Sequence, residues 1–341
     1  MVMSEKSQVD RLRESGGMME IGTADDSSAI TAMLSLGDIL YTIKENGIYA
    51  IKLADSIDPK RINPNIPNVQ QRVLNYGSEF QIVGQTLLTA RKLFNESFLP
   101  KSFDCTRAIT LSLDALKDIV AMYEEMKAFQ LSEDTEKVAF DNRQQKNGSL
   151  IMPAIGNVKA RCMNFYQKAD HASQSLFSIV KLFYEKEVGA GGFESLAKVV
   201  VQKYGKDDSF AKFAIDVAPR LKCIRNIRNC LEHPNPPNQI ANVRDFDLGS
   251  DGVISPPMIE ARYRGEHYPM MPISWFMTDT VDGLSGIFEN MIAFLCSKHV
   301  QQIGGFQAEV IEMLPEWKQR ENIHVRFSYG IQMNGQIVPA G

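Results

Sequence analysis

Residues 156–187 have the sequence GNVKARCMNFYQKADHASQSLFSIVKLFYEKE, the most regular segment of this 341-residue chain. Its apolar residues recur at alternating intervals of four and three: Val158, Cys162, Phe165, Ala169, Ala172, Leu176, Ile179 and Phe183. That spacing places them along one face of a helix. Such a stripe packs against a neighbouring helix at a shallow crossing angle, so the segment predicts a helix in the core of a bundle.

Further helices are expected on both sides of this segment. The patterns predict them over 28–36, 69–95, 102–131, 193–204, 208–232 and 274–299, with a long polar loop over 132–154. Pro100, Gly205 and Pro234 mark helix ends, because proline cannot continue a helix and glycine favours its termination.

Three other segments alternate between apolar and polar residues and predict β-hairpins. The first is Asp38–Leu53, where Asn46-Gly47 would occupy the two positive-φ positions of a tight type I′ turn. The second lies at 243–265 around Gly-Ser-Asp-Gly, and the third surrounds Asn334-Gly335. Together these patterns predict a mainly α fold: a helical bundle with peripheral β-hairpins near both termini and one inserted after the helix that ends before Pro234.

The same patterns predict four regions along the chain. Residues 1–28 are polar and rich in Gly and Ser, and we expect them to be disordered. Residues 29–68 would hold a β-hairpin and a proline-rich connector, residues 69–300 the helical bundle, and residues 301–341 a C-terminal β-hairpin extension.

Composition limits the class of protein. The chain is 44% hydrophobic and 23% charged, which is typical of globular domains, and its net charge is −4. The longest apolar run, Met291–Cys296, is far shorter than the roughly 20 residues that span a bilayer, and the polar start does not resemble a signal peptide. Five scattered cysteines favour a reducing compartment. We therefore expect a cytoplasmic protein without membrane contact.

One segment concentrates chemically useful side chains: VAPRLKCIRNIRNCLEHPNPP, residues 217–237. Between Val217 and Leu231 it has no acidic residue and four basic ones, which are Arg220, Lys222, Arg225 and Arg228. On a helix, Arg225, Asn229 and His233 share one face, because they are four residues apart. Ile224, Ile227 and Leu231 occupy another face, which can enter the core. The polar face is thus free to meet solvent or a partner.

The hexapeptide Arg228-Asn229-Cys230-Leu231-Glu232-His233 resembles the signature of the HEPN superfamily. That signature is an arginine followed after four to six residues by a histidine, often with Asn, Asp or His directly after the arginine, late in a helix of an all-α bundle. The resemblance covers the motif and, loosely, residues 69–300. A second Arg-x4-His, Arg262 to His267, contains Gly265 and lies in a segment without helical periodicity, so we set it aside.

The resemblance implies a metal-independent endoribonuclease, a toxin or phage-defence effector, in which a ribose 2′-OH attacks the adjacent phosphorus. Arg228 and His233 would be catalytic, and Asn229 would orient the histidine. Three further cations would hold the RNA backbone: Arg225, Lys222 and Arg220. It also implies a homodimer that shares one site, no cofactor, and a protein partner such as an antitoxin.

Other interpretations of these residues remain open. His233 can instead cap the C-terminus of the helix, where its side chain would bind a backbone carbonyl. Arg228 can pair with Glu232 on a solvated face of the helix. A non-catalytic helical module would use the same residues to bind RNA, a nucleotide or a protein. A structural assembly protein would bind no ligand, and these residues would then have no binding role. A zinc site at Cys223, Cys230 and His233 is excluded, because the two cysteines lie about 10 Å apart along a helix.

Overall fold

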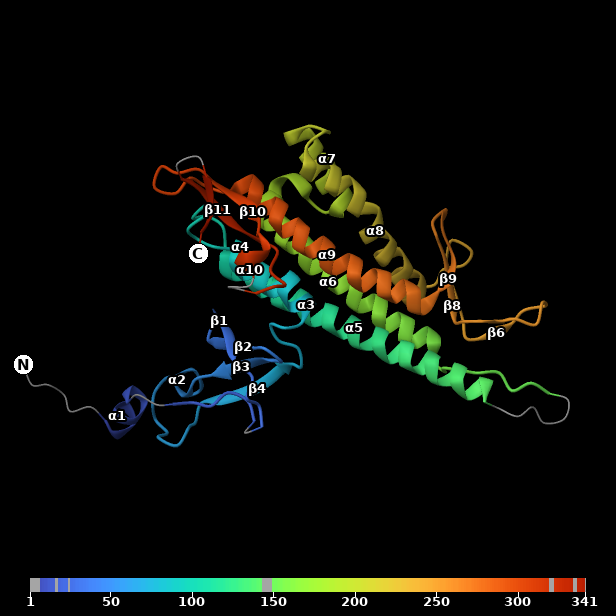
Figure 1. The fold of residues 1–341 in the computed structure, drawn as a ribbon, viewed down its shortest axis with the longest axis horizontal. Helices are drawn as coiled ribbons and strands as arrows, with labels where there is room; N and C mark the ends of the chain where they lie inside the picture. The colour runs from blue at the N-terminus through green and yellow to red at the C-terminus, as the bar shows by residue number, and fades with distance from the viewer. Residues whose placement is uncertain are drawn as a thin grey trace, which may run out of the picture. The chain divides into compact units, whose positions relative to one another are not determined.

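The computed structural model describes residues 7–15, 18–23, 25–142, 149–318, 322–333 and 336–340, and the chain divides into two units (Figure 1). Unit 1 comprises the described residues of 1–88 and 312–326, and unit 2 those of 89–311 and 327–341. Every residue of the predicted site belongs to unit 2.

Unit 1 is built on an antiparallel sheet with the strand order β1-β2-β3-β4. Its strands are β1 (Ile30–Leu36), β2 (Ile39–Lys44), β3 (Ile48–Lys52) and β4 (Val69–Leu74). Its short helices are α1 (Gln8–Glu14), α2 (Ala54–Ile57), α3 (Gln81–Val83), the π-helix η1 (Gly84–Leu88) and α10 (Pro315–Lys318). Ile43, Ile48 and Ile51 are buried at the centre of the sheet. Burial of these β-branched residues stabilises the sheet.

The hairpin predicted for Asp38–Leu53 is confirmed as β2 and β3, but its turn differs from the predicted one. Ile43 pairs with Ile48, and the Lys44 N–H donates to the Gly47 carbonyl at 2.8 Å, so Glu45 and Asn46 form the turn. Neither Asn46 nor Gly47 has a positive φ. Gly47 instead allows a close approach, because a Cβ there would lie 2.9 Å from the Arg72 side chain.

The helix predicted over 28–36 is wrong, and the helix predicted over 69–95 is wrong in its first part, since residues 81–93 are helical. Residues 30–36 form β1, and residues 69–74 form β4, the first part of the helix predicted over 69–95. Neither segment shows the strict alternation of a half-buried strand, so its pattern alone does not distinguish a strand from a helix. In the folded chain β1 and β4 pair with the two strands of the hairpin, which supplies hydrogen-bond partners to backbone groups that would otherwise lie unpaired at its edges.

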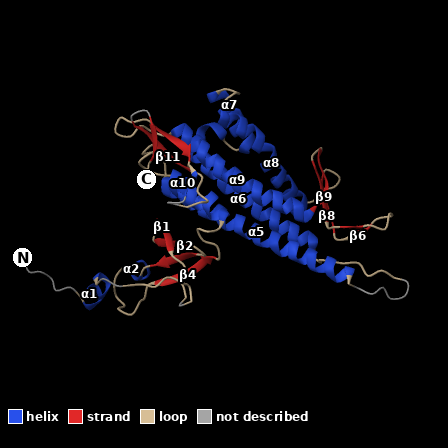
Figure 2. Cartoon of the chain, viewed as in Figure 1, coloured by secondary structure: helices blue, strands red, loops and turns tan. Residues whose placement is uncertain are grey.

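Unit 2 contains a bundle of long helices, in which α6 (Val158–Val188) contacts each of the others (Figure 2). Those helices are α5 (Cys105–Asp141), α7 (Gly192–Tyr204), α8 (Ser209–Glu232) and α9 (Ile273–His299), and the short α4 covers Thr89–Leu93. The stripe of α6 is buried from Val158 to Ile179, as its spacing predicts. The helix kinks at Tyr184, next to the last stripe residue, Phe183.

Helix α5 extends through part of the predicted loop over 132–154, so that prediction is wrong as far as Asp141. The Glu133 carboxylate, which is buried, pairs with Lys137 one turn later at 2.5 Å. The hydroxyl of Thr135 donates to the carbonyl of Leu131. These local contacts keep a polar sequence helical; residues 143–148 lie outside the described residues.

The strands of unit 2 form three further antiparallel sheets. One has the order β5-β8-β9 and lies beside the end of α8; it comprises β5 (Gln239–Arg244), β8 (Met258–Tyr263) and β9 (Glu266–Pro272). The hairpin of β6 (Asp247–Leu248) and β7 (Ile254–Ser255) extends from it. The third sheet has the strand order β10-β11-β12 and comprises β10 (Ala308–Glu312), β11 (Phe327–Met333) and β12 (Gln336–Pro339). Strands β11 and β12 confirm the predicted C-terminal hairpin; Asn334 and Gly335 lie outside the described residues.

The predicted fold class, a mainly α helical bundle of HEPN type with peripheral hairpins, is wrong. The structure is 50% helical and 21% strand, and its strands form four separate antiparallel sheets. Hairpins were visible in the sequence because each is local. The third and fourth strands that turn a hairpin into a sheet come from segments whose own periodicity is weak, and only tertiary pairing selects them.

The segment predicted to be disordered, residues 1–28, lies partly outside the described residues, at 1–6, 16–17 and 24. Its described part includes α1, which begins with a capping box between Ser7 and Asp10. Arg13 of α1 pairs with Asp55 at 2.7 Å and with Asp58 at 3.3 Å. Helix α1 is thus bound to the connector that follows β3.

None of the described helices is long and apolar enough to cross a membrane.

Candidate functional site

Helix α8 carries every residue of the predicted site except His233, which directly follows its last residue. It begins at the Asp208 cap, whose carboxylate accepts from the backbone N–H groups of Phe210 and Ala211. Ile224, Ile227 and Leu231 are buried, as predicted. The helix ends at Glu232, and the Gln239 side chain of β5 donates to the last carbonyls, those of Asn229 and His233.

Arg228 and His233 meet at one carboxylate oxygen, Glu232 Oε2. Arg228 Nη2 lies 2.7 Å from it and His233 Nε2 lies 3.6 Å from it. The side chain of His233 is 67% exposed, whereas those of Arg228 and Glu232 are 23% and 13% exposed. The buried Arg228 Nε has no hydrogen-bond partner among the described residues. An accessible imidazole beside an arginine is an arrangement that can move a proton next to a bound anion.

Asn229 lies in the same cluster but engages other groups than the predicted one. Its Oδ1 accepts from Arg228 Nη1 at 3.1 Å, and its Nδ2 donates to the hydroxyl of Tyr263 at 3.5 Å. The amide therefore orients the arginine and links α8 to β8, rather than holding the imidazole of His233.

Two of the three predicted RNA-binding cations are paired with acids. Lys222 Nζ lies 2.7 Å from Glu266 Oε1 and 3.2 Å from Glu194 Oε1, while Arg225 Nε lies 3.4 Å from the buried Asp170 Oδ1. The third, Arg220, is exposed at the rim of a groove of about 120 Å³ between α8 and α9.

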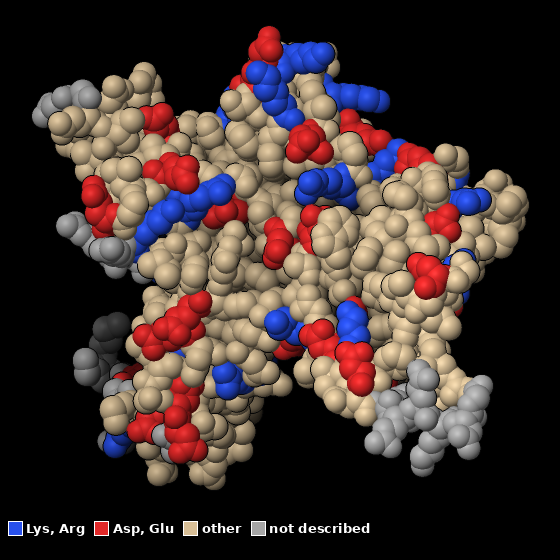
Figure 3. Space-filling model, turned by 45° about the vertical axis from the view of Figure 1, so that its right-hand side comes forward, with Lys and Arg blue, Asp and Glu red and all other residues tan. Residues whose placement is uncertain are grey.

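The acids come from α6, α7 and β9, so the acid-free run in the sequence does not produce a free basic surface. Figure 3 shows basic and acidic side chains interspersed over the visible face.

A polar network around the buried Asn226 fixes the sheet β5-β8-β9 to α8. Asn226, which is buried, donates to Glu266 Oε2 at 2.9 Å and to the Tyr268 hydroxyl at 2.8 Å, and that hydroxyl donates to Glu266 Oε2 at 2.7 Å. The ammonium of Lys222 lowers the pKa of Glu266, and the Glu266 carboxylate raises the pKa of Lys222. Burial raises the pKa of Tyr268. The sequence offered no signal for this network, because its members are about 40 residues apart.

We expect Asn226→Ala to lower the free energy of unfolding by about 1–3 kcal/mol, because it removes a buried donor that binds the Glu266 carboxylate and the Tyr268 hydroxyl. Urea denaturation followed by circular dichroism measures the change. Asn238→Ala, at an exposed position, serves as the control and should stay within about 0.5 kcal/mol of wild type. Equal stability of the two variants would contradict the role assigned to Asn226.

The two cysteines of α8 pack in the protein interior. Burial raises the pKa of Cys223 to about 12, and the buried thiol of Cys230 donates to the Arg262 carbonyl at 3.2 Å. Across the part of the chain that the structure describes, no group of three or more His, Cys, Asp or Glu side chains is placed to hold a metal ion.

The second Arg-x4-His motif does not lie in a helix, but a β-hairpin brings its arginine and histidine together. Arg262 and His267 are cross-strand partners on β8 and β9, joined by Arg264 and Gly265, which both have positive φ. This is the tight turn that a two-residue hairpin requires, and it occurs here rather than at Asn46-Gly47.

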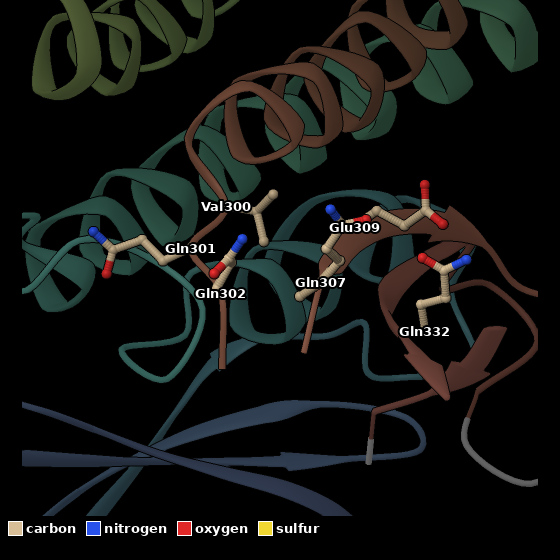
Figure 4. A pocket seen from close by; sticks show the side chains of 7 residues that line it. Val300, Gln301, Gln302, Gln307, Glu309 and Gln332 are labelled. Atoms are coloured by element: carbon tan, nitrogen blue, oxygen red, sulfur yellow. The ribbon is translucent and has the colours of Figure 1, made fainter. Parts of the chain in front are cut away.

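A pocket of about 260 Å³ lies apart from these clusters, between the end of α9 and strands β10 and β11 (Figure 4). Gln301 and Gln302 lie on one side, and Gln307, Glu309 and Gln332 on the other. It has neither histidine nor a cation among its lining residues, so it offers nothing for proton transfer at a phosphate near neutral pH.

Comparisons of the chain with protein-family models, with curated proteins and with solved structures found no match.

Proposed function

We propose that this protein is a metal-independent endoribonuclease of the cytoplasm, with its catalytic site at Arg228 and His233. The observation that carries the proposal is the exposed His233 imidazole, which shares the Glu232 carboxylate with Arg228. The resemblance of residues 228–233 to the HEPN motif supports it. Five free cysteines, four of them buried, support a reducing compartment.

The proposed reaction needs one proton acceptor and one anion-binding group. His233 takes the proton of a ribose 2′-OH, and the 2′ oxygen forms a bond to the adjacent phosphorus. The bond from phosphorus to the 5′ oxygen breaks, and that oxygen takes up a proton from water or from His233 of the partner subunit in the proposed homodimer. The products are a 2′,3′-cyclic phosphate and a 5′-hydroxyl.

Arg228 would stabilise the charge that develops on the phosphate oxygens. Its guanidinium must exchange the contacts to Glu232 and Asn229 for phosphate oxygens, because both terminal nitrogens are engaged in the free protein. Glu232 then remains beside His233, with its Oε2 3.6 Å from His233 Nε2.

The decisive assay compares two RNAs of one sequence in EDTA: natural RNA, and RNA with 2′-O-methyl groups throughout. We expect cleavage of the natural RNA to fragments ending in a cyclic phosphate and no cleavage of the methylated RNA, which lacks the attacking hydroxyl. Cleavage of both, or dependence on added Mg²⁺, would exclude this mechanism. The mass of the protein in solution tests the homodimer.

The ion pairs of Lys222 and Arg225 favour a second candidate, a non-catalytic module that binds a protein such as an antitoxin. These contacts leave little net positive charge on α8, which suits a protein surface better than a phosphate chain. A well-folded wild type that binds the methylated RNA or a protein partner and cleaves no RNA would support this candidate over the nuclease.

A further inference from the structure

The sheet β5-β8-β9 has an outer face, turned away from α8, that bears Asn242, Arg244, Glu260, Arg262 and His267. Ile259 and Ala261 of β8 are buried, so the residues that alternate with them, Glu260 and Arg262, point to the other side. Asn242 is the cross-strand partner of Glu260, and His267 is that of Arg262. The alternation therefore gathers side chains from three strands on one surface.

Glu260 organises two of these side chains. His267 Nε2 lies 2.8 Å and Arg262 Nη2 3.3 Å from the same oxygen, Glu260 Oε1, while Asn242 donates to Oε2 at 3.3 Å. The hydrogen bond with His267 lowers the pKa of Glu260, so the carboxylate stays ionised and holds both groups in place. Arg262 and His267 remain 62% and 53% exposed.

Arginines outnumber acids on this face, whereas Lys222 and Arg225 of α8 are paired with acids of other elements. Arg244 is exposed and has no ion pair among the residues that the structure describes. It lies four residues along β5 from Ile240, the partner of Arg262, which is about 14 Å along the strand. The outer face thus offers two arginines and His267 against one carboxylate, that of Glu260.

We propose that this outer face is the docking surface for the phosphate backbone of single-stranded RNA. Guanidinium groups bind phosphate through two parallel hydrogen bonds, and the exposed Arg244 and Arg262 lie on the same side of the sheet. Strands β5 and β8 contact α8, so they hold the face close to the helix that carries Arg228 and His233. The inference rests on the proposed function and assigns RNA binding to the sheet instead of to Lys222 and Arg225.

The test measures binding of 2′-O-methyl RNA, which is not cleaved, by fluorescence anisotropy over a series of salt concentrations. The double variant Arg244→Ala/Arg262→Ala should bind more weakly than wild type. The slope of log K against log salt should fall in magnitude by about 0.7 for each phosphate that the protein no longer binds, or about 1.4 for the two arginines. The control Arg107→Ala/Lys127→Ala removes the same charge from exposed positions of α5 and should leave the slope unchanged.

The outcomes separate the two proposals. If wild type cleaves natural RNA but the double variant binds the methylated RNA with the wild-type slope, the docking surface is excluded and the nuclease stands. If both double variants reduce the slope equally, binding follows net charge and the sheet has no special part. If wild type neither binds nor cleaves RNA, the proposed function fails and this inference fails with it.

Discussion

Replacing His233 by alanine is expected to lower the rate of RNA cleavage in EDTA by about 10²–10⁴-fold, the usual contribution of a general acid–base group. Histidine is the side chain whose ordinary pKa allows it to take and give protons near neutral pH. Glu232, the other titratable group of the cluster, is a carboxylate that shares its Oε2 with Arg228. His233→Ala therefore removes the one proton acceptor that the proposed mechanism uses.

His233→Ala should leave the fold intact, because the side chain is 67% exposed and lies at the end of α8. We expect its free energy of unfolding to stay within about 0.5 kcal/mol of wild type. His171→Ala, on the exposed side of α6, is the matched control and should cleave at the wild-type rate. Equal rates for all three proteins would place the activity elsewhere or in a contaminant.

Phe165→Ala should lower the free energy of unfolding by about 3–5 kcal/mol, the cost of removing a large aromatic side chain from a packed core. Phe165 is fully buried, and its ring meets that of Tyr166 edge to face, with 5.1 Å between the centroids. It lies in α6, which contacts each of the other long helices, so the cavity loosens the centre of the bundle. Urea denaturation followed by the helical circular dichroism signal measures the loss.

Two variants show whether the loss at Phe165 comes from the cavity. Phe165→Leu keeps most of the volume and should cost clearly less than the alanine variant. Lys186→Ala removes an exposed side chain from the same helix and should cost no more than about 0.5 kcal/mol. A Phe165→Ala protein as stable as the Lys186→Ala protein would show that the α6 stripe is not the core of unit 2.

The helices of unit 2 followed from the sequence because their periodicity is local. The four-and-three spacing along α6 specifies which side is buried, whatever covers it, and the same holds for Ile224, Ile227 and Leu231 of α8. The pairing of Arg228 with Glu232 near the end of α8 followed as well, because residues four apart on a helix are neighbours wherever the helix packs.

Tertiary structure alone decided which partners those residues acquired. Strands β1 and β4 joined a hairpin because pairing satisfied the backbone groups at its edges. Lys222 and Arg225 met acids from other elements, and Glu260 joined Arg262 to His267 across a turn. A linear pattern records how each segment presents its side chains. The charge and hydrogen bonds at a site depend on groups that are distant in the chain and meet only when it folds.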